Sequence, residues 1–240
     1  MDFTLSKEQR DIQKAAREFA VGEFLPEKAQ EFDRNETFDL SIWRKACELG
    51  FVGVFIDEKY GGAGLGFLEH CLITEEFWAV DAGMGNAVIT ATFGSELLKL
   101  FGTEEQKQKY LPPLVQGEAI MGCAITEPDA GSDVTGAITS AVKDKDEWVI
   151  NGSKMFITNG TIAKYMNVFC LTDPDHKDRH QRHSFFIVET DRKGFQANKL
   201  HGKLGIRAND TAEVSFSNVR IPASNLVGQL GYGFRHLMAF

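Results

Sequence analysis

The segment from Ala124 to Asp133, AITEPDAGSD, gathers polar groups that could hold a ligand. It begins as a strand and then turns sharply, because Pro128 fixes its own φ and Gly131 permits a positive φ. Such a turn can aim several backbone N–H groups into one concavity. The hydroxyls of Thr126 and Ser132 add uncharged donors that suit the edge of an electron-rich ring or a phosphate. On these residues alone, an ordinary capped turn is the favoured interpretation.

A second segment, KMFITNG from Lys154 to Gly160, adds an aromatic side chain and a further hydroxyl. Strand alternation places Phe156 and Thr158 on one face and Ile157 on the other. A flat polar ring could stack on the aromatic side chain and accept a hydrogen bond from the hydroxyl. The alternative is a core phenylalanine on an ordinary sheet strand.

Several familiar ligand-binding and catalytic motifs are missing from the sequence. The glycine cluster YGGAGLG, from Tyr60 to Gly66, is not GxGxxG and does not follow a strand. No Walker sequence occurs, so dinucleotide folds built on a glycine loop are unsupported. The residues around Ser132, AGSDV, do not form the GxSxG nucleophile elbow.

The run DPDHKDRHQRH, from Asp173 to His183, holds three of the six histidines beside several carboxylates. A metal site is one interpretation. However, the spacing matches no standard ligand pattern, and the run joins two expected strands. A solvated hairpin loop is therefore favoured, and no metal is expected.

The composition favours a protein of a reducing compartment. The net charge of −8 argues against a general binder of nucleic acids or anionic membranes. The four cysteines are far apart in sequence, which disfavours disulfides and zinc sites. The first residues resemble neither a signal peptide nor a transit peptide, and no apolar run could span a bilayer. We expect a cytoplasmic protein, or the mature form of a mitochondrial matrix protein.

The elements that position these segments are predicted from two different hydrophobic periodicities along the chain. Residues 1 to about 120 have helical periodicity. Two Ser/Thr-to-Gln pairs, three residues apart, predict capping boxes, and glycines follow two of the expected helices. The capping pairs are Ser6 with Gln9 and Thr103 with Gln106; expected helices cover Ser41 to Leu49, Phe67 to Val80 and Asn86 to Phe101.

From about Met121 the pattern becomes alternating, as in β-strands. Asn151-Gly152 lies between two alternating segments and predicts a tight hairpin. Further strands are expected over Asn167 to Thr172, Ser184 to Glu189 and Glu213 to Pro222. The chain then ends with a glycine-rich turn and the beginning of an apolar helix.

The expected fold class is α+β. An N-terminal helical domain (1–120) precedes a β-barrel or sandwich-like middle domain (121–228), and residues 229–240 begin a C-terminal helical bundle. An apolar helix of one or two turns has little to bury against. We therefore expect a fragment of a longer protein; the alternative is that the last helix docks on earlier ones.

Together these segments resemble the acyl-CoA dehydrogenase family of flavoproteins over nearly the whole chain and in order. The TEPDAGSD and KMFITNG pair at this spacing is specific to that family. The matching segments are ELGFVGVFIDEKYGGAGLG (48–66), GTEEQKQKYLPPLVQGE (102–118), AITEPDAGSD, INGSKMFITNG, KLGIRANDTAEVSFSNVRIP (203–222) and the final GYGF.

The resemblance implies FAD as the cofactor, bound without a glycine-loop fold. It implies that Thr126 bonds near N1 and O2 of the isoalloxazine, that Phe156 stacks beside the ring and that Thr158 reaches N5. Ser132 would also lie near the acyl-CoA, as a substrate-binding residue. The implied cofactor-binding residues are Cys123, Ala124, Ile125, Thr126, Gly131, Ser132, Phe156, Ile157 and Thr158.

Three positions depart from the family pattern. Cys123 stands where the family often has an aromatic residue, and Phe156 where it often has tryptophan, which loses an indole N–H. Asn209 stands where the family often has serine. These changes keep the flavin site but reshape its pocket.

The implied reaction is α,β-dehydrogenation of an acyl-CoA, with a carboxylate removing the α-proton and the β-hydride moving to flavin N5. In the family that carboxylate lies in the C-terminal bundle, beyond Phe240, so no catalytic residue is identified. Glu127 belongs to the motif as a structural residue and is not assigned as the base. Electrons would pass to an electron-transferring flavoprotein, and the assembly would be a homotetramer or homodimer.

The acyl group is less well indicated. Glutaryl-CoA dehydrogenases carry an arginine near the stretch that here reads DAGMGNA (Asp81 to Ala87), which has no basic residue. A neutral acyl group is therefore favoured, with Thr90, Thr92 and Phe93 as candidates for lining its cavity. Alternative functions are an acyl-CoA oxidase or flavin monooxygenase of the same fold, or a truncated, non-catalytic scaffold.

Overall fold

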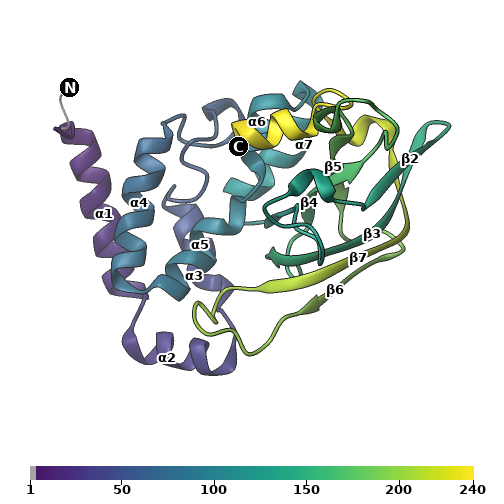
Figure 1. The fold of residues 1–240 in the computed structure, drawn as a ribbon. Helices are drawn as coiled ribbons and strands as arrows, with labels where there is room; N and C mark the ends of the chain where they lie inside the picture. The colour runs from purple at the N-terminus through teal and green to yellow at the C-terminus, as the bar shows by residue number, and fades with distance from the viewer. Residues whose placement is uncertain (1–3) are drawn as a thin grey trace. The chain divides into compact units, whose positions relative to one another are not determined.

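The computed structural model describes residues 4–240, shown in Figure 1. These residues form two units whose sequences interleave. The helical unit comprises residues 4–91, 112–118 and 201–210, and the sheet unit comprises residues 92–111, 119–200 and 211–240. The predicted domain boundary near residue 120 stays a prediction.

The helical unit begins with the predicted capping box. Ser6 Oγ accepts from Gln9 N (3.1 Å), and the Gln9 side chain accepts from Ser6 N (2.9 Å), which confirms the start of α1. Phe19 and Phe77, from α1 and α4, lie with ring centroids 5.4 Å apart in an aromatic core. The helices are α1 (Lys7–Glu23), α2 (Pro26–Asn35), α3 (Leu40–Glu48), α4 (Phe67–Val80) and α5 (Ala82–Ile89).

The single helix predicted from Asn86 to Phe101 was wrong, because Gly94 interrupts it. The chain instead forms α5, a 3-10 turn over Thr90–Thr92 and α6 (Ser95–Phe101). Gly94 has φ of 100°, and a Cβ there would lie 3.2 Å from the Cys123 Cβ. Its carbonyl also accepts a hydrogen bond from Asn167 Nδ2 at 2.8 Å. Packing against β1 and β4 therefore breaks the helix at a residue that tolerates left-handed backbone.

The next helix, α7 (Glu104–Val115), begins as predicted at Thr103. Thr103 Oγ1 accepts from Gln106 N (3.2 Å), and Gln106 Oε1 accepts from Thr103 N (3.1 Å). Gln106 Nε2 donates to the carbonyls of Ser224 and Leu226, each at 2.8 Å. The capping residue therefore also ties the beginning of α7 to the final strand of the sheet unit.

Within residues 4–240, eight strands form one hydrogen-bonded sheet in the order β6-β7-β3-β2-β4-β5-β8, with β1 pairing with β4. Neighbouring strands are antiparallel except that β4 runs parallel to β1 and β2. This confirms a helical region followed by a sheet. The strands are β1 (Met121–Ala124), β2 (Ser140–Asp144), β3 (Glu147–Thr158), β4 (Tyr165–Leu171), β5 (His183–Glu189), β6 (Phe195–Lys199), β7 (Thr211–Pro222) and β8 (Leu226–Val227).

The predicted hairpin at Asn151-Gly152 was also wrong, because both residues lie inside β3. The turn between β2 and β3 is instead made around Lys145, which has φ of 56°. Gly152 lies at a register shift between β3 and β7 and has φ of 142°. A Cβ there would come within 2.5 Å of Thr139 Oγ1, so Gly152 allows close packing inside the strand.

The last helix, α8 (Gly233–Ala239), packs on α6 within the sheet unit, as Figure 1 shows in yellow and teal. The rings of Phe101 and His236 stack with centroids 4.1 Å apart. Phe93 and Phe240 lie 5.2 Å apart. Among residues 4–240, no helix combines the length and the apolar character needed to cross a membrane.

A half-buried carboxylate joins α7 to the end of β5 in the sheet unit. Glu189 Oε1 accepts hydrogen bonds from Tyr110 Oη (2.6 Å) and Lys109 Nζ (2.8 Å), and its Oε2 accepts from Arg192 Nε (2.7 Å). Partial burial alone would raise the pKa of Glu189. The three donors outweigh burial and lower that pKa to about 2.

We expect Glu189→Gln to destabilise the protein by about 1–3 kcal/mol at neutral pH. The folded-state pKa lies below the unfolded one, so the contribution is complete above about pH 5 and disappears as the pH falls toward 2. Urea denaturation at several pH values should therefore show a difference in the free energy of unfolding between wild type and Glu189→Gln that becomes smaller in acid. The matched control is Glu147→Gln, which removes an exposed partner of Arg220 and should cost less than about 1 kcal/mol. A difference that stays constant with pH would contradict this role for Glu189.

Candidate functional site

The first candidate residues lie on and just after β1. Cys123 and Ala124 are buried in this strand and pair in register with Asn167 and Val168 of β4. Burial raises the pKa of the Cys123 thiol well above its usual range. Cys123 is therefore a packed, unreactive residue, and the strand offers a ligand its backbone more readily than these side chains.

Ile125 and Thr126 are half-buried where β1 passes into the turn. The carbonyl of Thr126 accepts a hydrogen bond from Met155 N of β3 at 2.9 Å. This bond brings Thr126 beside Phe156, the neighbour of Met155, although the two are thirty positions apart in the sequence. None of the described residues hydrogen-bonds the Thr126 hydroxyl, which is therefore available to a ligand.

Gly131 and Ser132 lie further along the turn and are exposed. The expectation that Gly131 adopts a positive φ was wrong, since it is not among the glycines with left-handed backbone. The turn closes instead through two backbone hydrogen bonds between Glu127 and Ala130 (2.9 and 3.2 Å). A Cβ at Gly131 would meet no protein atom within 4 Å, so glycine here leaves room above the turn.

Phe156 has the most unusual conformation among the candidate residues. It has φ of 62° and lies at a bulge between Lys154 and Ile157, where three steps of β3 match two of β7. Its side chain is 66% exposed, whereas Ile157 is buried and Thr158 is half-buried. Left-handed backbone is strained for a residue with a side chain. The bulge thus points a large aromatic ring toward solvent. Because the ring is not buried, packing in a core does not account for this conformation.

These residues fit the edge of a flat, polar, aromatic cofactor. No hydroxyl among Thr126, Ser132 and Thr158 has a hydrogen-bond partner within residues 4–240. The exposed Phe156 ring lies near Thr158 at the end of β3. The hydrogen bond from Met155 N to the Thr126 carbonyl also brings Thr126 beside this ring. Stacking on Phe156 and hydrogen bonds to free hydroxyls are the contacts that an isoalloxazine ring can use.

Beneath the turn lies a buried ion pair that was not predicted as part of the site. Lys154 Nζ lies 2.8 Å from Glu127 Oε1, and the two side chains are 0% and 4% exposed. Burial opposes ionisation of Glu127, yet the Lys154 charge and the hydrogen bonds it receives keep the pKa of this carboxyl below its usual range. The available sequence signal was a lysine at a buried position of an otherwise apolar strand face.

The Glu127 carboxylate is buried, with its side chain 4% exposed, and three protein donors engage it. It accepts hydrogen bonds from Lys154 Nζ (2.8 Å), Ile138 N (2.7 Å) and Thr139 N (2.8 Å). A general base must come within hydrogen-bond reach of the proton that it removes, and burial beneath the turn keeps this carboxylate from a substrate. Glu127 is therefore a structural residue, which agrees with leaving it unassigned as a base.

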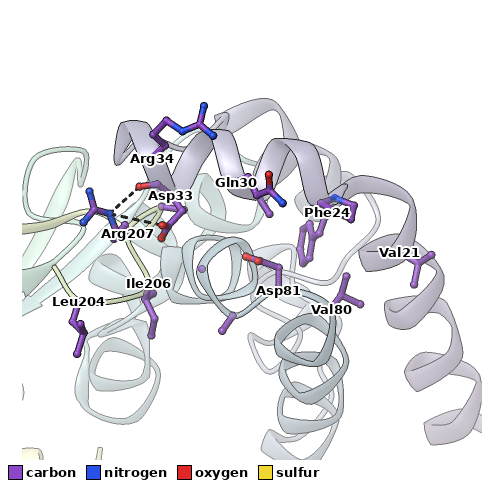
Figure 2. A pocket seen from close by; sticks show the side chains of 15 residues that line it. Val21, Phe24, Gln30, Asp33, Arg34, Val80, Asp81, Leu204, Ile206 and Arg207 are labelled. Atoms are coloured by element: carbon purple, nitrogen blue, oxygen red, sulfur yellow. Dashed lines mark hydrogen bonds and ion pairs between the residues drawn. The ribbon is translucent and has the colours of Figure 1, made fainter. Parts of the chain in front are cut away.

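A separate hollow of about 1150 Å³ lies in the helical unit (Figure 2). Arg207, which lines it, donates to the Asp33 carbonyl at 2.9 Å and lies 2.8 Å from Glu36 Oε1. Asp81, which also lines the hollow, accepts from Met84 N as the cap of α5. Both side chains therefore have structural roles, and the Arg207 charge is paired with Glu36.

Two of the candidates for an acyl cavity make internal contacts. The Thr90 hydroxyl donates to the Asn86 carbonyl at 2.7 Å and lies 3.3 Å from Asn209 Oδ1. Thr92 is buried, and Phe93 packs against Phe240. Their assignment to an acyl cavity stays a prediction.

The histidine-containing run from Asp173 to His183 has local hydrogen bonds. Asp178 accepts from His180 N at 3.0 Å, and His176 Nδ1 bonds with the backbone of Asp178. No group of three or more His, Cys, Asp or Glu residues within 4–240 is arranged to hold a metal ion. The solvated-loop interpretation accounts for these contacts.

Comparison with protein families gives two matches that together cover most of the chain. The acyl-CoA dehydrogenase N-terminal domain matches residues 6–118. The acyl-CoA dehydrogenase middle domain matches residues 122–219.

Three similar proteins illustrate the relationship. A short-chain-specific acyl-CoA dehydrogenase from Clostridium acetobutylicum is 40% identical over 236 residues, covering 98% of this chain and 61% of the relative. A structure described as the electron transferring flavoprotein of Acidaminococcus fermentans has a TM-score of 0.92 and 39% identity, covering 99% of this chain and 62% of that one. An acyl-CoA dehydrogenase from Bacillus anthracis, solved in complex with FAD, has a TM-score of 0.86 and 35% identity, covering 98% and 40%.

The chain thus spans about three fifths of the length of the Clostridium relative. The two family matches run in the same order along the chain as the helices and strands described above. The family matches and the similar proteins point to the same family as the motif pair TEPDAGSD and KMFITNG. This chain belongs to the acyl-CoA dehydrogenase family.

Proposed function

We propose that this protein catalyses the FAD-dependent α,β-dehydrogenation of an acyl-CoA thioester to the enoyl-CoA. The observation that carries the proposal is Phe156, an exposed aromatic ring on left-handed backbone, beside the unengaged hydroxyls of Thr126 and Thr158. Membership of the acyl-CoA dehydrogenase family supports the same reading. The FAD complex of the Bacillus anthracis relative supports the choice of cofactor.

We propose the following roles for the chain's own residues. Phe156 stacks beside the isoalloxazine ring, Thr158 donates to its N5 edge and Thr126 donates to its pyrimidine edge. Cys123, Ala124, Ile125 and Ile157 contribute backbone and packing along that edge. Gly131 and Ser132 approach the ring or its ribityl-phosphate chain, and Ser132 also binds the acyl-CoA.

The proposed chemistry has two parts, a proton loss and a hydride loss from neighbouring carbons. When bound, FAD supplies the acceptor for the β-hydride at N5. The thioester α-proton is only weakly acidic, so the developing enolate oxygen needs preorganised donors. Because the Glu127 carboxylate is buried and engaged by three protein donors, it is not assigned as the base, and we assign no other base among residues 4–240.

The substrate, partners and organisation form part of the same proposal. The short-chain-specific relative and the absence of a basic residue from Asp81 to Ala87 support a short, neutral acyl group. The flavoprotein structure from Acidaminococcus fermentans supports an electron-transferring flavoprotein as electron acceptor. We also propose a homotetramer or homodimer, the domain division near residues 120 and 228, and the reducing cytoplasm that four unpaired cysteines favour.

The function is tested by anaerobic absorbance spectra of the FAD-loaded protein before and after adding acyl-CoAs of different chain length. We expect a short, neutral acyl-CoA to bleach the flavin and to yield its enoyl-CoA. Rapid recovery of the absorbance in air would instead favour an oxidase or monooxygenase. A yellow protein that no thioester bleaches would contradict the substrate class, and a protein that takes up no FAD would contradict the flavin site.

We expect Phe156→Gly to separate folding stability from cofactor binding. Glycine accepts φ of 62° without strain, so the stability of the apoprotein should rise by up to about 1 kcal/mol. The affinity for FAD should fall about fivefold, because a stacking contact worth about 1 kcal/mol is lost. Denaturation and FAD titration of the apoprotein measure the two effects.

The matched control for this prediction is Lys145→Gly. Lys145 also has left-handed backbone, with φ of 56°, but lies in the turn between β2 and β3. We expect a similar gain in stability with no change in FAD affinity. If Phe156→Gly bound FAD as wild type does, the residue would not belong to the site.

A further inference from the structure

The buried pair of Lys154 and Glu127 lies directly under the turn that carries the candidate flavin ligands. Lys154 is on β3 and is completely buried. Its ammonium group donates to Glu127 Oε1 at 2.8 Å and to the Ile125 carbonyl at 2.9 Å. The ammonium also lies 5.8 Å from the centre of the Phe169 ring. One side chain of β3 therefore holds two residues on the incoming side of the turn, Ile125 through its carbonyl and Glu127 through its carboxylate.

Glu127 extends this attachment to the outgoing side. Its two carboxylate oxygens accept from the backbone N–H groups of Ile138 and Thr139, at 2.7 and 2.8 Å. A single carboxylate thus connects Glu127, near the start of the turn, with residues eleven and twelve positions later. Ala137, the residue before these, is held by His183, whose Nε2 lies 2.9 Å from the Ala137 carbonyl oxygen.

The residues between these attachments have few other supports. Pro128, Asp129 and the stretch from Gly131 to Asp133 are exposed, and the stretch lies outside the strands. Asp133 accepts a hydrogen bond from the nearby Thr135 hydroxyl at 2.7 Å and pairs with Arg179 at 2.6 Å; the Asp133 and Arg179 side chains are both more than half exposed. Exposed ion pairs hold a loop only weakly. The order of the turn therefore depends chiefly on the buried pair at its base.

A buried charge pair is a poor choice for stability alone. Burying two charges costs more free energy than burying two apolar side chains of similar size. Buried ion pairs can therefore often be replaced by apolar residues without loss of stability. Here the pair also satisfies two backbone N–H groups and one carbonyl that an apolar replacement would leave unpaired. This second task indicates a role in setting the shape of the turn.

We propose that Lys154 and Glu127 are positioning residues: together they fix the turn from Ile125 to Thr139 and so place Thr126 and Ser132 for the flavin. Thr126 directly precedes Glu127 and bonds to Met155, the residue after Lys154. Any shift of the pair therefore moves Thr126 relative to Phe156. Placement for the flavin rests on the proposed function, whereas the fixing of the turn does not.

The test compares three variants of the protein. Lys154→Met leaves the Glu127 carboxylate buried without its cation. The double variant Lys154→Met with Glu127→Leu removes both charges, so the cost of an unpaired buried charge disappears. The control, Val219→Ala, truncates a fully buried side chain of β7, five residues beyond Val214, the register partner of Lys154.

Amide hydrogen exchange of the apoprotein reports on the turn without any cofactor. We expect the amides of Ile138 and Thr139 to exchange at least tenfold faster in both Lys154 variants, relative to β4 amides in the same protein. In Val219→Ala this ratio should stay as in wild type, even with a lower melting temperature. Wild-type exchange at Ile138 and Thr139 in the double variant would overturn the proposal.

FAD binding reports on whether Thr126 and Ser132 are placed correctly for the flavin. We expect the dissociation constant for FAD to rise at least tenfold in both Lys154 variants and the visible circular dichroism of the bound flavin to change, while Val219→Ala keeps both. The double variant should recover thermal stability relative to Lys154→Met without recovering FAD affinity. If the double variant recovered both thermal stability and FAD affinity, the pair would have a structural role alone, and its role in placing the flavin ligands would be overturned. If wild type bound no FAD, the proposed function would fail, and the exchange data alone would decide whether the pair fixes the turn.

Discussion

The candidate site depends on one buried charge pair. Lys154 and Glu127 are both removed from water, and neither can lose its partner without leaving an uncompensated charge in a low-dielectric environment. The pair is therefore a strong constraint on where the two segments can lie. Because each side chain also bonds to backbone groups, the constraint passes from two side chains to a whole turn.

A second constraint acts along β3. A bulge between Lys154 and Ile157 keeps the lysine and the isoleucine buried while turning Phe156 outward. A regular strand of the same residues could expose every second side chain, but it could not place Lys154 and Ile157 on the same buried face, because they are three residues apart. The left-handed backbone at Phe156 and Asn159 is the local cost of that arrangement. Local rules are broken here, where the exposed aromatic ring lies, as is common at functional sites.

Much of the fold followed from local signals. Both capping boxes form as predicted, because a hydroxyl and an amide three residues apart satisfy the free N–H groups of a helix start wherever it is placed. The change from helical to alternating periodicity correctly separated helices from strands. The motif pair indicated the family, which the comparisons confirmed.

What the sequence alone determined was therefore which segments are helices and strands, the family, and the residue types of the candidate site. The tertiary structure decided which glycines bend the chain. Asn151-Gly152 is a good local hairpin, but β7 pairs along both sides of it and keeps it within β3. Gly94 breaks a good local helix, because Cys123 and Asn167 approach it closely, whereas Gly131 needs no special backbone. The partner of Lys154 was likewise not identifiable from the sequence, since a buried ion pair between residues 27 positions apart exists only once the sheet has brought them together.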